Sequence, residues 1–141
     1  MKALKCLVAV IVAGVVGNTL DYAVQAKWLA SAYYSKIESM RMDTPVSQFV
    51  FADFVGVFVL AWVLCRLSAS FASGAKGGAT AGFYLGVLVN FPAYHFIFLT
   101  FKGYPYPLVW INTVYGVVWY VIIGAILGAF MCKAAAPAPA S

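Results

Sequence analysis

Two long uncharged stretches decide the fold of this chain. Residues 77–101 read GGATAGFYLGVLVNFPAYHFIFLTF, and residues 108–132 read LVWINTVYGVVWYVIIGAILGAFMC. Neither contains an Asp, Glu, Lys or Arg over its 25 residues. About 20 apolar residues, rising about 1.5 Å each in an α-helix, cross the roughly 30 Å hydrocarbon core of a bilayer. Each stretch therefore predicts one membrane-spanning helix.

Two further apolar stretches precede them, at about 6–26 and 47–65. The whole chain is 65% hydrophobic and 9% charged, whereas soluble domains carry about 25% charged residues. We predict an all-α fold, a four-helix transmembrane bundle, forming a single domain over residues 1–133 with spans at about 6–26, 47–65, 77–101 and 108–132. The Ala/Pro tail at 134–141 has no residues with which to pack a core.

The N-terminal stretch also has features of a secretory signal peptide. Lys2 and Lys5 precede the apolar residues 7–16, and Val24-Gln25-Ala26 resembles a cleavage site. Removal of this segment would leave three spans and would discard Gly14 and Gly17. We therefore expect an uncleaved first span.

The segment 27–43 allows two interpretations. Apolar residues at 29, 33, 37 and 40 recur at helical spacing among charged and hydroxyl side chains. This pattern fits an interfacial helix between spans one and two, lying at headgroup level. It also fits a helical continuation of the first span followed by a polar loop.

Loop charge predicts how the chain is threaded. Five basic residues (Lys2, Lys5, Arg66, Lys76 and Lys133) fall on the side of the termini, against four (Lys27, Lys36, Arg41 and Lys102) on the other. Cys6, Cys65 and Cys132 all fall on the first side, where a reducing cytoplasm would keep them as thiols. Under the positive-inside rule we expect an integral membrane protein with both termini cytoplasmic.

Glycine spacing predicts how the helices pack. Gly78, Gly82 and Gly86 repeat every four residues, and Gly124 and Gly128 form a GxxxG pair in the last span. Small residues allow close backbone approach between helices in lipid, where apolar burial gives no drive to associate. We expect these five glycines to form helix-packing faces.

Six of the polar residues within the spans are candidates for a site, and most of them lie at one depth from the outer ends: Asp21, Asp53, His95, Asn18, Asn90 and Asn112. Ionisable groups at membrane depth are costly and usually face protein or water. We expect Asp21, Asp53 and His95 to converge. The cluster would form either a polar pocket open to the outside, which could bind a proton, a metal ion or a small cationic ligand, or a satisfied hydrogen-bond cluster that fixes helix register.

Motifs for chemistry are weak. His95 could be the axial ligand of a haem or pigment, and a divalent metal could bind Asp21, Asp53 and His95. The sequence requires neither cofactor, and it has no zinc-ligand spacing, phosphate loop or nucleophile elbow. We predict no catalytic residues and no metal site, so we expect a protein that is not an enzyme. The net charge of +5 comes without a basic stripe, so no nucleic-acid partner is expected.

The layout resembles a group of small bacterial four-span membrane proteins of the DUF1761-like kind. The matching features are the polar break Gly17-Asn18-Thr19-Leu20-Asp21-Tyr22, the glycine-rich entry at 74–86, Pro92, the Pro107-Leu-Val-Trp110 start and the exit at Gly124 and Gly128. The resemblance implies the four-span fold and a bacterial inner membrane location. It implies no activity.

Two functions follow from these features. The first is a non-catalytic accessory or scaffolding subunit of a larger energy-converting or transport complex, with the lipid bilayer and other membrane subunits as partners. The alternative is a small transporter or a ligand- or ion-binding membrane protein that uses the outer-half polar pocket.

Overall fold

Four helices are long and apolar enough to cross a membrane. The computed structural model describes residues 2–38, 43–67, 70–71 and 74–131, which form helices and no strands. The stretches long and apolar enough to span a bilayer are Leu4–Lys36, Val46–Leu67, Gly74–Thr100 and Tyr106–Phe130. The protein is therefore an integral membrane protein with the predicted all-α, four-helix architecture. The predicted tail at 134–141 and Cys132 lie outside the described residues.

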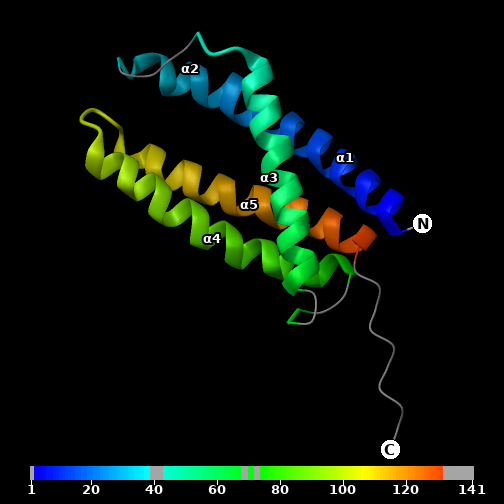
Figure 1. Cartoon of the computed structure of the whole chain (residues 1–141). Helices are drawn as coiled ribbons and strands as arrows, with labels where there is room; N and C mark the ends of the chain where they lie inside the picture. The colour runs from blue at the N-terminus through cyan, green and yellow to red at the C-terminus, as the bar shows by residue number, and fades with distance from the viewer. Residues whose placement is uncertain (1, 39–42, 68–69, 72–73, 132–141) are drawn as a thin grey trace, which may run out of the picture.

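The first crossing is a continuous helical rod of three segments (Figure 1). Helix α1 spans Lys2–Asp21, the π-helix η1 spans Tyr22–Leu29, and the short α2 spans Ala30–Ala32. A 3-10 turn, η2, follows at Tyr34–Lys36. Of the two interpretations of residues 27–43, the structure has the helical continuation, and no separate interfacial helix occurs up to residue 38. Residues 39–42 lie outside the described part of the chain.

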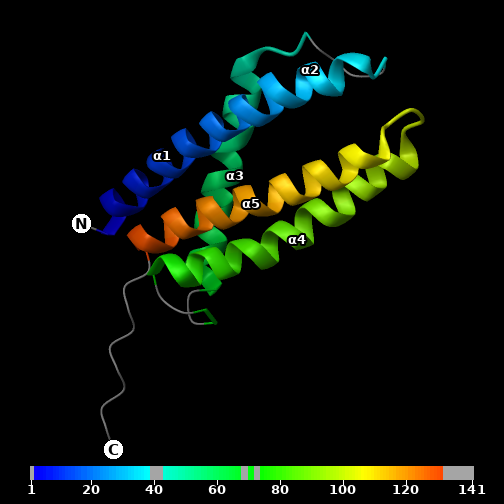
Figure 2. The ribbon, with the colours of Figure 1, turned by 180° about the vertical axis from the view of Figure 1, so that it is seen from behind.

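The remaining helices are α3 (Val46–Leu67), α4 (Gly74–Thr100) and α5 (Tyr106–Met131). A tight turn joins α4 to α5, and Gly103 there has a φ of 91°, which glycine adopts without the steric penalty of a side chain. The start of α1, the end of α3, the start of α4 and the end of α5 lie at one end of the molecule, called here the terminal end (Figures 1 and 2). Helix α3 crosses the others at a steep angle in both views.

Helices α4 and α5 pack through the predicted glycines. A Cβ at Gly78 would collide with the backbone oxygen of Gly124, and a Cβ at Gly82 would collide with that of Tyr120. A Cβ at Gly128 would lie 2.9 Å from Cα of Gly78. The two backbones thus touch where side chains would hold them apart, which confirms the packing role expected for Gly78, Gly82, Gly86, Gly124 and Gly128.

Buried apolar residues form two clusters at different heights. The larger cluster lies toward the terminal end and contains Ala9, Ala13, Val57, Leu60, Ala61, Leu64, Ala81, Trp119, Ile123 and Leu127. The smaller cluster contains Leu29, Ile37 and Leu108, at the opposite end. Between them, the helices carry polar side chains.

Candidate ligand-binding pocket

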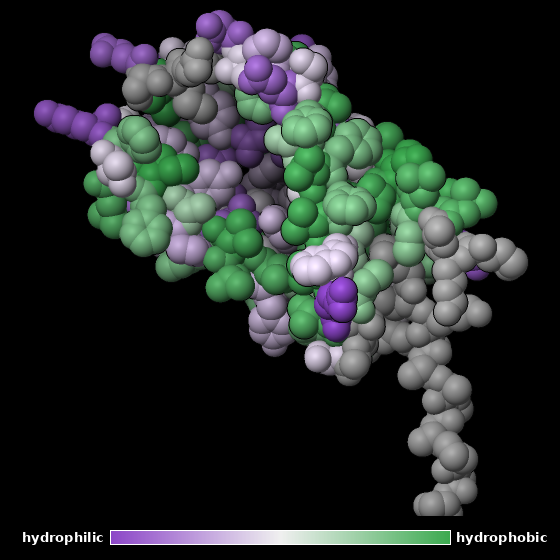
Figure 3. Space-filling view, in the orientation of Figure 1, coloured by the Kyte–Doolittle hydropathy of each residue, from purple (hydrophilic) through white to green (hydrophobic). Residues whose placement is uncertain are grey.

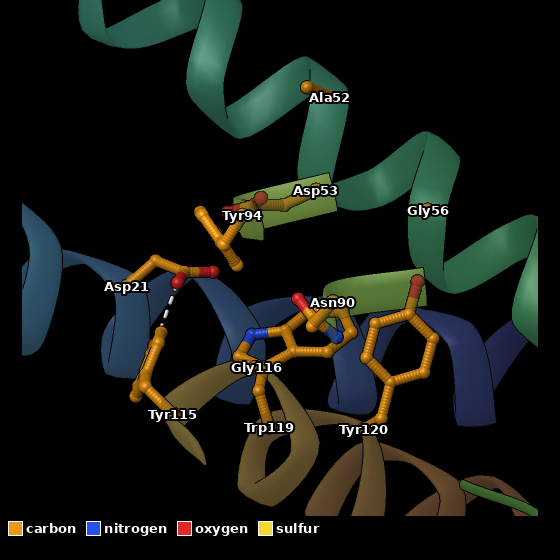
Figure 4. A pocket seen from close by; sticks show the side chains of 10 residues that line it. All are labelled: Asp21, Ala52, Asp53, Gly56, Asn90, Tyr94, Tyr115, Gly116, Trp119 and Tyr120. Atoms are coloured by element: carbon orange, nitrogen blue, oxygen red, sulfur yellow. Dashed lines mark hydrogen bonds between the residues drawn. The ribbon is translucent and has the colours of Figure 1, made fainter. Parts of the chain in front are cut away.

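A cavity of about 210 Å³ lies between the two apolar clusters. Side chains from all four crossings line it (Figure 4): Asp21, Ala52, Asp53, Gly56, Asn90, Tyr94, Tyr115, Gly116, Trp119 and Tyr120. In the space-filling view, hydrophilic surface is visible inside a hollow beside α3, framed by hydrophobic side chains (Figure 3). The lining contains two carboxyl groups and no Lys, Arg or His.

The two carboxyl groups approach each other from different helices. Asp21 is the last residue of α1, where the α-helix gives way to the π-helix, and its Oδ1 accepts a hydrogen bond of 2.7 Å from the Tyr115 hydroxyl. Asp53 lies in the first half of α3, and its carboxyl lines the same cavity as that of Asp21. Because both are acidic and no basic side chain lines the pocket, the pair is most stable when it holds a proton or another cation.

Asn90 contributes a further acceptor. Its side chain is only 8% exposed, and its Nδ2 donates to the backbone oxygen of Gly86 at 2.8 Å. Within the described residues, its Oδ1 accepts no hydrogen bond, and the amide faces the pocket in Figure 4. Gly116 makes room for this amide, since a Cβ there would lie 2.8 Å from Nδ2 and closer still to Oδ1.

Aromatic rings make up much of the remaining wall. Tyr94, Tyr115, Trp119 and Tyr120 all line the cavity. The rings of Trp119 and Tyr120 meet edge to face with centroids 5.3 Å apart, and the Trp119 indole nitrogen donates to the Gly17 backbone oxygen at 3.4 Å. Gly17 is the residue that admits this ring, because a Cβ there would lie 2.9 Å from Cζ2.

Asn112 belongs to a different polar cluster, on the side of the pocket away from the terminal end. It is fully buried, its Oδ1 accepts from Gln25 Nε2 at 3.3 Å and from the Tyr34 hydroxyl at 3.0 Å, and its Nδ2 donates to the Tyr104 hydroxyl at 2.9 Å. Burial raises the pKa of the Tyr104 phenol above its ordinary value. This cluster is satisfied internally and ties the π-helix to α5 and to the α4–α5 turn, so it matches the register-fixing interpretation.

His95 does not join the pocket, which corrects the expectation that Asp21, Asp53 and His95 converge. Its Nδ1 lies 2.7 Å from the Phe91 backbone oxygen, and its ring stacks on Phe91 and meets Trp110 edge to face at 5.2 Å. Successive helical residues point about 100° apart, so His95 faces away from the cavity that Tyr94 lines. An axial haem or pigment ligand here would have to be Nε2.

Two other sequence expectations change. Asn18 donates its Nδ2 to the Gly14 backbone oxygen of its own helix at 2.8 Å, so this amide is used locally. Without His95, the divalent-metal set loses its third ligand, and the described residues hold no group of three or more His, Cys, Asp or Glu that could bind a metal ion. The pocket thus brings together Asp21, Asp53 and Asn90 from the six expected residues.

Sequence reasoning missed the aromatic half of the site. Tyr115 and Trp119 are four residues apart on α5 and so share a face. A tyrosine well inside a span needs a partner for its hydroxyl, and this signal could have linked Tyr115 to one of the carboxylates. Gln25 and Tyr34 gave no comparable signal, because their position depends on the π-helix.

No protein-family model, no curated protein and no solved structure matches this chain. The resemblance to DUF1761-like membrane proteins therefore stays a prediction, and function has to be argued from the pocket itself.

Proposed function

We propose that this chain is a small polytopic membrane protein that binds a cation in the pocket between α1, α3, α4 and α5, as a carrier or a binding protein rather than as an enzyme. One observation carries the proposal. Asp21 and Asp53 come from separate helices, face one cavity and have no basic side chain in the lining. Burying two interacting carboxylates without a counter-charge is unfavourable, so the site favours a cationic occupant.

The test is cation-dependent stability of the purified chain in lipid nanodiscs. A ligand that binds only the folded state stabilises it by RT ln(1 + [L]/Kd), about 2.7 kcal/mol at one hundred times Kd. Thermal unfolding would be compared in sodium, potassium and ethylammonium chloride at equal ionic strength. We expect at least one cation to raise Tm, and Asp53→Asn, which keeps the shape and removes the charge, to abolish that increase.

Glu38→Gln is the matched control, because it removes one negative charge from an exposed residue outside the pocket. It should retain the full cation-dependent increase. The proposal fails if no cation stabilises the wild-type chain more than it stabilises Asp53→Asn.

A second candidate function is a non-catalytic accessory subunit of a larger membrane complex. The observation that favours it is a stripe on α3 made of Phe51, Val55, Phe58 and Trp62, called here the α3 stripe. Each of these residues is at least 45% exposed, and their spacing puts them on one helical face. By contrast, the α4 glycine face is occupied by α5, so it gives no support for an external partner.

We also propose a cellular location for the protein and an orientation of its termini. The bacterial inner membrane and the cytoplasmic placement of both termini rest on the family resemblance and on the excess of five over four basic residues.

A further inference from the structure

The size of the pocket argues against a bare metal ion. A water molecule occupies about 30 Å³ of liquid volume, whereas the cavity measures about 210 Å³. A bare ion would occupy only part of this space and would need water molecules to complete its coordination. The cavity instead has room for a polyatomic ligand that fills it.

Three side chains of the lining offer hydrogen-bond acceptors to the cavity. Asp21, Asp53 and the Oδ1 of Asn90 accept hydrogen bonds, and the Tyr115 hydroxyl already donates to Asp21. Asn90 supplies an observation independent of the carboxylates, since it is 8% exposed, its oxygen accepts no bond among the described residues, and its amide faces the cavity. A complementary ligand therefore carries several N–H donors and a positive charge.

The aromatic walls specify the rest of the ligand. Tyr94, Tyr115, Trp119 and Tyr120 surround the same cavity, and aromatic faces attract cations as well as apolar groups. A hydrated inorganic cation would gain little from these rings. An organic cation can place its ammonium group at the acceptors and its hydrocarbon body against the rings.

We infer that the pocket takes a primary organic ammonium ion with a small aryl or alkyl body, recognised by Asp21, Asp53 and Asn90 at its charged end and by Tyr94, Trp119 and Tyr120 along its apolar body. This inference rests on the proposed cation-binding function and names the ligand class. It predicts that N–H donors, charge and hydrocarbon surface all contribute to binding.

The experiment is calorimetric titration of the full chain in nanodiscs with four probes: phenethylammonium, tetramethylammonium, potassium and the neutral 2-phenylethanol. We expect phenethylammonium to bind most tightly. Tetramethylammonium, which has charge without N–H donors, should bind more weakly, and potassium and 2-phenylethanol should bind at least about tenfold more weakly, the size expected for losing one charged hydrogen bond.

Two substitutions at Tyr94 separate ring recognition from simple packing. Tyr94→Phe keeps the aromatic face and should leave phenethylammonium affinity nearly unchanged. Tyr94→Leu keeps apolar volume without the ring and should weaken it about two- to fivefold, in line with a cation–π contact. Glu38→Gln should bind like wild type, and Asp53→Asn should bind at least about tenfold more weakly.

The outcomes separate the two claims. If potassium or tetramethylammonium binds as tightly as phenethylammonium, in an Asp53-dependent way, the ligand class is wrong and cation binding stands. Equal binding by Tyr94→Phe and Tyr94→Leu also overturns the aromatic part of the inference. If 2-phenylethanol binds as well as phenethylammonium, or if no cation binds, both the inference and the proposed function are overturned.

Discussion

At the scale of single residues, the pocket depends on a few side chains held in place by specific partners. Tyr115 directs the Asp21 carboxyl through a 2.7 Å hydrogen bond, and Gly116, the next residue of α5, leaves space for the Asn90 amide. One short stretch of α5 therefore positions both a carboxylate and an amide. Removing the Tyr115 hydroxyl, or filling the space at Gly116, should disturb the site without removing a charge.

Tyr115→Phe tests the hydrogen bond to Asp21. The change deletes one hydroxyl and leaves a carboxylate oxygen without its donor, so we expect the free energy of unfolding to fall by about 1.5–3 kcal/mol, as for a hydrogen bond to a charged group. Reversible unfolding in mixed micelles measures it. Tyr22→Phe is the control, because Tyr22 is exposed and its ring contact with Lys27 needs no hydroxyl. Equal stability of both variants would show that the Tyr115–Asp21 bond contributes nothing.

At the scale of elements, the bundle is built on one tight helix pair. The α4–α5 interface runs through backbone-to-backbone contacts at Gly78, Gly82 and Gly128, whereas α3 crosses the others steeply (Figure 1). The pocket lies between α3 and this pair. It therefore forms where the steeply crossing α3 does not pack closely along α4 and α5.

Gly82→Ala tests the close approach of α4 and α5. Its Cβ would lie 2.8 Å from the Tyr120 carbonyl carbon and closer to the oxygen, so the helices must separate. We expect destabilisation of about 1–3 kcal/mol, the range for overpacking. Gly56→Ala is the control, since nothing lies within 4 Å of its Cβ position, and it should be neutral or slightly stabilising through better helix propensity. Equal losses at both positions would refute the packing explanation.

At the scale of the whole molecule, the crossings are layered along their length. An apolar cluster at the terminal end is followed by the pocket, then by the Asn112 cluster, then by the apolar contact of Leu29, Ile37 and Leu108. On the α1–α5 side, buried contacts thus close the pocket both toward the terminal end and toward the opposite end.

The α3 stripe predicts how the protein behaves on extraction. If it is the docking face of an accessory subunit, the chain should comigrate with larger membrane proteins after gentle solubilisation, and Phe51→Ala with Phe58→Ala should release it. The matched control is Phe83→Ala with Phe96→Ala, because both of these exposed rings lie on α4. Migration of the wild-type chain alone, in native electrophoresis and cross-linking, would reject the accessory-subunit function.

Sequence reasoning predicts the position of a residue along a helix better than the direction in which its side chain points. Counting residues from the span ends placed Asp21 and Asp53 at one height, because rise per residue is fixed in a helix. It was wrong for Asn112, which lies in a separate cluster beyond the pocket. It did not predict their direction around the helix axis. Tyr94 and His95 are neighbours in sequence and in height, yet only Tyr94 lines the pocket.

By itself, the sequence determined that the chain belongs in a membrane, has four helices long and apolar enough to cross it and carries glycine packing faces, because length, hydropathy and four-residue spacing are local properties. Only the tertiary structure decided that Tyr115 and Trp119 join Asp21 and Asp53 in one pocket, that Asn112 instead joins Gln25 of the π-helix, and that His95 turns away. Those outcomes depend on how each helix is rotated and crossed against the others, and that is set by contacts between residues far apart in the chain.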